Sequence, residues 1–95
     1  MNLALHPAAV AEVQNAYDYY LEKDPTVAED FLTLLDRSLE LLTKFPERYP
    51  TYNHGTRRML LKRFPYQLIY QVREDEILIL AVAHSRNRPF YWTDR

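Results

Sequence analysis

The segment that decides the fold runs from Tyr66 to Ala83 and reads YQLIYQVREDEILILAVA. Two runs rich in β-branched and aromatic residues, Tyr66 to Val72 and Glu76 to Ala83, flank the short polar stretch Arg73-Glu74-Asp75. This pattern predicts two antiparallel strands joined by a hairpin turn. Polar alternation is absent from Ile77 to Ala83, which predicts that the second strand is buried on both faces.

The segments before this hairpin predict two helices, a loop and two further strands. Apolar residues of the helical segments recur at three- and four-residue steps, and each helix has a proline at its first position. In chain order we expect a strand over Asn2–His6, helices from Pro7 to about Lys23 and from Pro25 to just before Pro46, a loop over Pro46–Thr56, and a strand over Arg57–Phe64. The prediction is a single α+β domain over residues 1–95, with the order β-α-α-β-β-β and a helical hairpin on a mostly antiparallel sheet.

The two helices are expected to be buried to different degrees. In the first, the apolar stripe is predicted to contain Val10, Val13, Tyr17, Tyr20 and Leu21. The second has a broader stripe, so we expect it to be the more deeply buried of the two.

The doubly buried strand requires cover on both faces of the sheet. A helical hairpin covers only one face. The C-terminal tail, a second copy of the chain or a dedicated protein partner must shield the other face. Of these three, burial by a partner is the interpretation that we favour from the sequence.

The composition excludes several kinds of site. Hydrophobic residues make up 47% and charged residues 26% of the 95 residues, as in ordinary globular domains. There is no cysteine, and His6, His54 and His84 lack a short metal-ligand spacing, so we expect no metal and no cofactor. The N-terminal residues have no cationic start and no long apolar run, which predicts no membrane association and a cytoplasmic location.

The net charge of −1 hides an uneven distribution along the chain. Residues 1–43 contain two cations and eight anions, whereas residues 44–95 contain ten cations and five anions, so the two parts have net charges of −6 and +5. This asymmetry favours an anionic partner for the second part, such as nucleic acid or an acidic protein segment. The alternative is that the two parts attract each other.

The stretch RRMLLKRFPYQLIYQVREDEILILAVAHSRNRPFYW, from Arg57 to Trp92, resembles the RelE/ParE family of bacterial toxins. It contains a basic strand, an aromatic-Pro-Tyr turn, an Ile-Tyr strand, an apolar strand, an H-x-x-x-R-P segment and an aromatic tail. His6-Pro7-Ala8-Ala9 at the start of the first helix and Phe45-Pro46 at the end of the second also agree. The resemblance covers nearly the whole chain. It rests on the presence of all these motifs in this order.

The resemblance implies the toxin of a type II toxin–antitoxin module, ParE-like more than RelE-like. Such a toxin inhibits bacterial growth when free and contributes to plasmid stabilization. A cognate antitoxin silences it by wrapping an extended or helical segment over it, generally with an acidic contact surface. Both a homodimer and a toxin–antitoxin hetero-oligomer are compatible with this resemblance.

Family members have one of two activities, and the two need different residues. RelE-type members cleave messenger RNA on the ribosome without a metal, whereas ParE-type members poison DNA gyrase. Cleavage needs a base, an acid and cations over the phosphate. When RelE-type nucleases are aligned with this chain through the strand from Tyr66 to Val72, one of the cations that they use falls on Arg58. Two others fall on Leu60 and Gln67, which are not cationic. The resemblance therefore implies gyrase poisoning more than cleavage, and whether the chain is an enzyme stays open.

If the chain is a nuclease, the resemblance assigns catalysis to the sheet and the tail. Arg58, Arg86 or Arg88 would hold the phosphate, and His84 or Tyr91 would transfer a proton. A lone histidine at a strand end is more often a hydrogen-bonded edge residue, which is the alternative for His84.

A partner-binding surface is predicted for Arg57, Lys62, Arg63, Tyr91 and Trp92, because binding hot spots favour arginine and aromatic side chains. Two alternatives stay open. The basic residues occupy both faces of one strand, so a pair of them can form a solvated edge. The aromatic pair can instead fold back over the exposed face of the sheet.

The cluster Tyr17, Tyr19 and Tyr20 can stack on nucleic-acid bases. Core positions, with the hydroxyls at the rim, are a better fit for Tyr17 and Tyr20.

A third class of function also stays open. In it the chain is a non-toxic module that binds an antitoxin or nucleic acid through its basic sheet.

Overall fold

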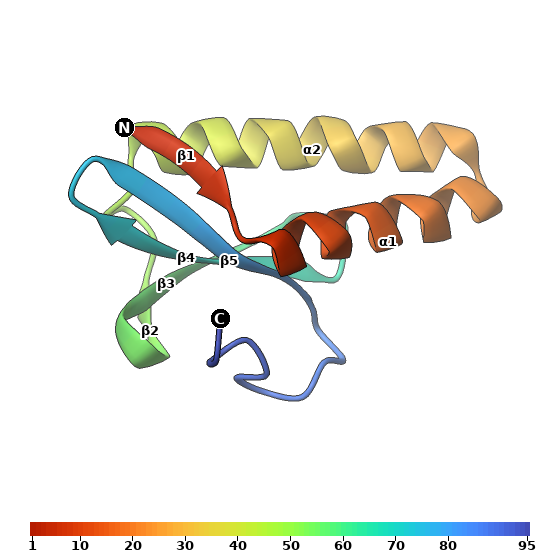
Figure 1. Ribbon diagram of the computed structural model, residues 1–95. Helices are drawn as coiled ribbons and strands as arrows, with labels where there is room; N and C mark the ends of the chain where they lie inside the picture. Colours follow the sequence, from red (N-terminus) through yellow and green to blue (C-terminus); the bar gives the residue numbers. More distant parts are fainter.

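The computed structural model describes residues 1–95, which form two long helices and one five-stranded sheet (Figure 1). The strand order is β1-β5-β4-β3-β2, with β1 parallel to β5 and all other pairs antiparallel. The elements are β1 (Asn2–Leu5), α1 (Pro7–Lys23), α2 (Pro25–Lys44), β2 (Thr51–Tyr52), β3 (Thr56–Leu60), β4 (Tyr66–Arg73) and β5 (Glu76–His84). The predicted α+β architecture is confirmed, with β2 as an addition inside the predicted loop.

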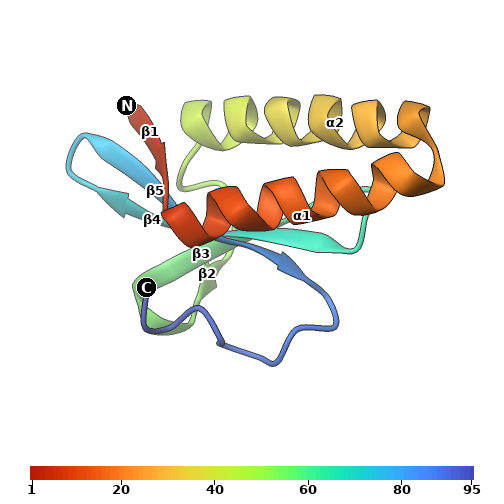
Figure 2. The same cartoon turned by 45° about the vertical axis from the view of Figure 1, so that its right-hand side comes forward.

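A single residue, Asp24, connects the two helices. Its backbone N–H donates to the Tyr20 carbonyl at 2.8 Å, and its side chain accepts the Thr26 N–H at 2.9 Å. Pro25 then occupies the first turn of α2, where its missing N–H costs no hydrogen bond. The chain therefore reverses at once, and Figure 2 shows α1 and α2 side by side on one face of the sheet.

As predicted, α2 is buried more deeply than α1. Its buried residues are Ala28, Phe31, Leu35, Ser38 and Leu42. By contrast, only Ala9 and Ala16 are buried in α1. The predicted stripe of α1 is wrong for Val10 and Leu21, which are 53% and 42% exposed. α1 is rotated so that its small alanine side chains face inward, and residues without bulk let a helix approach its neighbours closely.

The strand β5, which lies between β1 and β4, is buried on both faces, as predicted. Its buried residues divide between two clusters: Ile77, Ile79 and Val82 lie with the helices, and Leu80, Ala81 and Ala83 lie on the other face. Leu80 has no partner in β4, because the register shifts between Ile69 and Tyr70. Side chains of a strand alternate between its two faces, and this bulge shifts the alternation, so that the neighbours Leu80 and Ala81 both lie on the face away from the helices.

The face away from the helices is covered by the C-terminal segment, residues 85–95, which turns back beneath the sheet (Figure 1). Trp92 is 2% exposed and packs in one cluster with Ile69 and Leu80. The expectation that a partner shields this part of the face is therefore wrong, and the tail shields it within the chain. Ile69 of β4 lies on the same face and is fully buried for the same reason.

The predicted strand over Arg57–Phe64 is shorter than expected. It ends at Leu60, and the chain turns through Arg63, whose φ is +71°, before Pro65. The predicted loop contains β2 and a short helical turn over Asn53–Gly55. Tyr70 anchors the start of this loop, since its hydroxyl donates to the Pro46 carbonyl at 2.6 Å.

Candidate functional site

The sheet has an open edge at the end of β3. The last hydrogen bond on the outer side of this strand joins the Arg58 N–H to the Pro50 carbonyl at 3.1 Å. The Leu61 N–H faces the other way and donates to Tyr66 of β4 at 2.9 Å. Peptide groups alternate along a strand, so the N–H and C=O of Leu60 face the open edge. The Leu60 side chain is 68% exposed.

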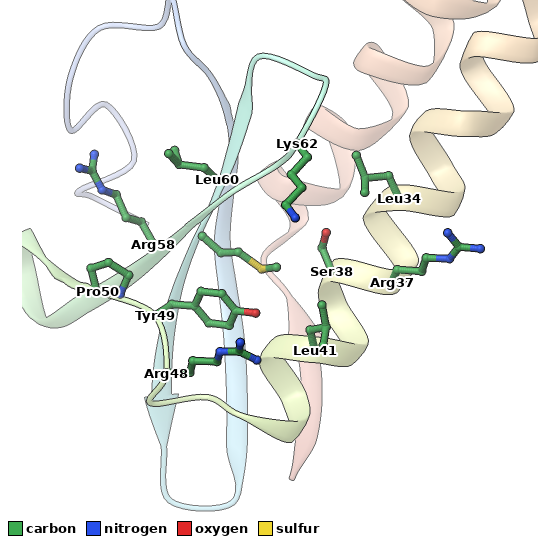
Figure 3. A pocket seen from close by; sticks show the side chains of 11 residues that line it. Leu34, Arg37, Ser38, Leu41, Arg48, Tyr49, Pro50, Arg58, Leu60 and Lys62 are labelled. Atoms are coloured by element: carbon green, nitrogen blue, oxygen red, sulfur yellow. The ribbon is translucent and has the colours of Figure 1, made fainter.

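A groove of about 630 Å³ lies between this edge and α2 (Figure 3). Two kinds of side chain dominate its lining: the apolar ones are Leu34, Leu41, Met59 and Leu60, and the cationic ones are Arg37, Arg48, Arg58 and Lys62. Neither aspartate nor glutamate lines it. An apolar surface with a cationic rim is complementary to an amphipathic, acidic protein segment.

Arg57 fixes one wall of this groove. Its guanidinium donates to the carbonyl oxygens of Glu47 and Tyr49 at 3.2 and 2.7 Å. These two bonds hold the loop from which Arg48 and Tyr49 extend toward α2 (Figure 3). Predicted as a partner-binding residue, Arg57 is half-buried, and these two bonds engage its guanidinium within the chain.

The other two basic residues of the predicted partner surface differ in position. Lys62 is exposed and lines the groove between β3 and α2 (Figure 3). Arg63 pairs with Asp30 of α2 at 2.9 Å, and its guanidinium lies 5.1 Å from the centre of the Phe64 ring. Only Lys62 of this pair is free to contact a molecule in the groove.

Arg58 stands between the groove and the covered face of the sheet. Its guanidinium stacks over the Tyr52 ring at 4.4 Å from the ring centre. Tyr52 in turn packs against Phe90 and Trp92 of the tail. Arg58 is thus the point at which the groove and the tail-covered face meet.

The structure brings together only some of the residues proposed for catalysis. His84, Arg88 and Tyr91 line a small hollow of about 190 Å³ under the tail, together with Gln67. Arg86 lines a different hollow. The Nδ1 atom of His84 accepts the Arg86 N–H at 3.0 Å, which matches the alternative of a hydrogen-bonded edge residue.

Tyr91 is tied to a residue that sequence reasoning missed, Glu12 of α1. The Tyr91 hydroxyl donates to the Glu12 carboxylate at 2.5 Å. The same carboxylate accepts the Val82 N–H at 3.0 Å and the Arg95 guanidinium at 2.8 and 3.0 Å. Arg95 also donates to the Leu80 carbonyl at 2.9 Å. Glu12 and Arg95 thereby satisfy the peptide groups of β5 beyond the end of β1.

Burial, together with the hydrogen bond to Glu12, raises the pKa of Tyr91 to about 12. A phenol that holds its proton this firmly is a poor proton donor or acceptor near neutral pH. Trp92, the other aromatic residue of the predicted partner surface, is buried in the tail cluster and presents no surface in this conformation.

No cluster of three or more His, Asp or Glu side chains is arranged to hold a metal ion. Neither helix is long and apolar enough to span a membrane.

Comparison with known proteins places the chain among toxins. The model of a family described as the ParE toxin of the type II toxin–antitoxin system parDE matches residues 3–89. A solved structure described as the chromosomal ParDE toxin–antitoxin system from P. aeruginosa superposes with a TM-score of 0.78 at 24% sequence identity. The match covers 88% of this chain and 95% of that one, and at this identity it shows the fold alone. No curated protein sequence matches.

Proposed function

Because the chain belongs to the ParE toxin family of type II toxin–antitoxin systems, we propose that it arrests bacterial growth when free and is silenced when a cognate antitoxin occupies the groove between α2 and β3. Its family membership confirms the resemblance seen from Arg57 to Trp92. Growth arrest, the cellular target and the docking groove form the proposal. We place the action in the cytoplasm, where gyrase and ribosomes both reside.

The charge of the groove supports an acidic antitoxin segment. Four cations surround an apolar floor, and no carboxylate offsets them. A segment with apolar residues on one side and acidic residues at its margins would bury Leu41 and Leu60 while pairing with Lys62. The open edge at Leu60 would also allow that segment to add a strand to the sheet.

The observation that carries gyrase poisoning over RNA cleavage is the state of Tyr91. Its hydroxyl is engaged by Glu12, and its pKa is raised to about 12. In addition, Leu60 and Gln67 occupy positions where cleavage would need cations. Each missing electrostatic contact would lower the rate by about 10²-fold or more. These features support a toxin that acts by binding a protein target, for which DNA gyrase is our proposal.

The test is to induce the chain alone in bacteria that carry either normal gyrase or a poison-resistant gyrase. We expect growth arrest, filamentation and DNA breaks that depend on the gyrase allele. Purified gyrase should also accumulate cleaved DNA when the chain is added. Growth arrest with intact DNA and normal supercoiling would contradict the proposal.

The remaining hypotheses have their own readouts in the same cells. New messenger ends at the ribosomal A site, abolished in the variant Arg86→Ala or Tyr91→Phe, would establish the nuclease instead. Normal growth after induction, with the folded chain present, would leave the non-toxic binding module.

The antitoxin groove is tested separately from the target. An antitoxin of the parDE type is co-expressed with the tagged chain, and co-purification is measured. Lys62→Glu should weaken the complex, because it opposes an acidic segment. Arg73→Glu, at the exposed β4–β5 hairpin, makes the same charge change elsewhere and should not. Equal loss in both variants would show that only overall charge matters.

A further inference from the structure

A second hollow, of about 540 Å³, lies where the last turns of α1 meet the β3–β4 turn and the end of β5. It shares no residue with the groove between α2 and β3. Its lining includes Tyr19, Tyr20, Tyr66, His84, Ser85 and Arg86. Three tyrosines and an arginine around one hollow, with no part in the proposed antitoxin groove, call for a separate explanation.

Core packing accounts for two of the three tyrosine rings. The ring centres of Tyr20 and Tyr66 lie 5.6 and 5.5 Å from that of Phe31, which is fully buried. Tyr20 thus packs at the core as predicted, whereas Tyr17 instead donates its hydroxyl to Glu29 at 3.3 Å. Tyr19 is 55% exposed, and the centre of its ring lies 5.2 Å from the Tyr20 ring centre and 5.2 Å from the Lys23 Nζ atom. The hydrophobic core does not account for Tyr19.

Several side chains around the hollow can donate hydrogen bonds that no acceptor within the chain takes. The hydroxyls of Tyr19, Tyr20 and Tyr66 make no hydrogen bond within the chain, nor does the guanidinium of Arg86. Burial raises the pKa of Tyr20 and Tyr66, so both hydroxyls keep their protons. Because Nδ1 of His84 accepts a backbone N–H, a neutral imidazole carries its proton on Nε2. No aspartate or glutamate lines the hollow.

We propose that this hollow binds an unpaired nucleotide of a nucleic-acid strand, with its base stacked on Tyr19 and its phosphate held by Arg86. The donors fit an anion, and the exposed ring supplies the flat surface on which any base can stack. The Nζ atom of Lys23, which lies over the Tyr19 ring at 5.2 Å from its centre, adds positive charge next to this ring. A carboxylate of an acidic peptide would use Arg86, but it would have no use for the ring face of Tyr19.

The inference goes beyond the proposed function, since it gives the chain its own nucleic-acid contact whichever target it acts on. The test uses the full chain made by cell-free translation, so that toxicity does not limit the yield. Binding of a fluorescently labelled oligothymidylate of roughly ten nucleotides is followed by anisotropy over a range of salt concentrations. A labelled polyglutamate peptide of equal length is the competing probe.

Tyr19→Ala should weaken oligonucleotide binding about 5- to 150-fold, the range for loss of one stacked base. Arg86→Gln should weaken it as well and make the slope of log K against log salt shallower by roughly 0.7, as for one lost phosphate contact on a single strand. Arg73→Gln removes an equal charge at the opposite hairpin and is the matched control. Both altered side chains are exposed, and circular dichroism checks that the variants fold.

Three results would overturn the inference. The first is no oligonucleotide binding at low salt. The second is an equal effect of Arg86→Gln and Arg73→Gln, which would indicate only a diffuse positive field. The third is tighter binding of the polyglutamate peptide that depends on Arg86 but not on Tyr19, which would assign the hollow to an acidic protein segment.

Discussion

Two apolar regions of the same sheet differ in whether the chain itself covers them. The face of β4 and β5 away from the helices is closed by the tail, with Trp92 at 2% exposure. The edge of β3 is left open, with Leu60 at 68% exposure beside a groove of about 630 Å³. The first region therefore contributes to the stability of the chain, and the second is available to another molecule.

The difference lies in the polar residues that accompany each region. Under the tail, Glu12 joins α1, β5 and the tail through Tyr91 and Arg95, so attractive contacts close the region. Around the groove the charged side chains are all cations, which repel one another, and no acidic residue lines the groove with them. An apolar surface with unbalanced charge is a surface for binding, because a partner of opposite charge satisfies both features at once.

The largest expected effect is on the closed region. Trp92→Ala should lower the free energy of unfolding by about 3–5 kcal/mol, because it leaves a large cavity under the tail. Urea unfolding followed by circular dichroism measures this change. A loss below 1 kcal/mol would mean that the tail does not belong to the folded core.

The next effect tests the hydrogen bonds through which Glu12 holds the tail. Glu12→Gln should cost about 2–3 kcal/mol, since it weakens several hydrogen bonds and leaves the Arg95 guanidinium, 17% exposed, without its counter-charge. Glu22→Gln, an exposed glutamate on the same helix, is the control and should change stability by less than about 0.5 kcal/mol. Similar losses of stability in the two variants would contradict this role of Glu12.

A smaller effect should appear at high pH. Burial raises the pKa of both Tyr70 and Tyr91 to about 12, above the ordinary value of 10.0. The folded chain keeps protons that the unfolded chain releases, so their contribution is complete below pH 10 and is lost as pH rises through 12. We expect stability to fall by about 2 kcal/mol for each of the two tyrosines over that interval. Tyr91→Phe and Tyr70→Phe should each flatten the fall, and an unchanged profile in the double variant would refute this assignment.

The smallest effect is expected at the open region. Leu60→Ser should change stability by no more than about 0.5 kcal/mol, because the side chain is already in water. The same substitution should weaken co-purification of the antitoxin if the groove is its docking site. A large loss of stability would show that Leu60 belongs to the core and would remove the contrast with Trp92.

Local patterns in the sequence were sufficient for most of the secondary structure. Asp24-Pro25 marks the change from one helix to the next. The Asp24 side chain caps the second helix and Pro25 lacks an N–H, and both effects act over only a few residues. The apolar run of β5 predicted burial on both faces, and the structure confirms it. The bulge at Leu80, which places Leu80 and Ala81 on the same face, has no such local signal.

Sequence reasoning was less successful for the candidate site. Lys62 was assigned to a partner surface and lines the groove, but Arg37 and Arg48 of the same groove lie on other elements and were not singled out. Trp92 was assigned to a partner surface as well, yet it is buried. Charge and aromatic content along one segment do not reveal which residues of distant segments come to lie beside them.

By itself, the sequence determined the order of helices and strands, the double burial of β5 and the family, since each of these depends on neighbouring residues or on motifs in a fixed order. The tertiary structure decided which segment covers the second face of the sheet, which face of α1 turns inward, and what Glu12 does. Glu12 meets the Val82 N–H across 70 residues and Arg95 across 83. Such contacts form only when the whole chain is packed, so no local pattern encodes them, and the same packing leaves the groove beside Leu60 open.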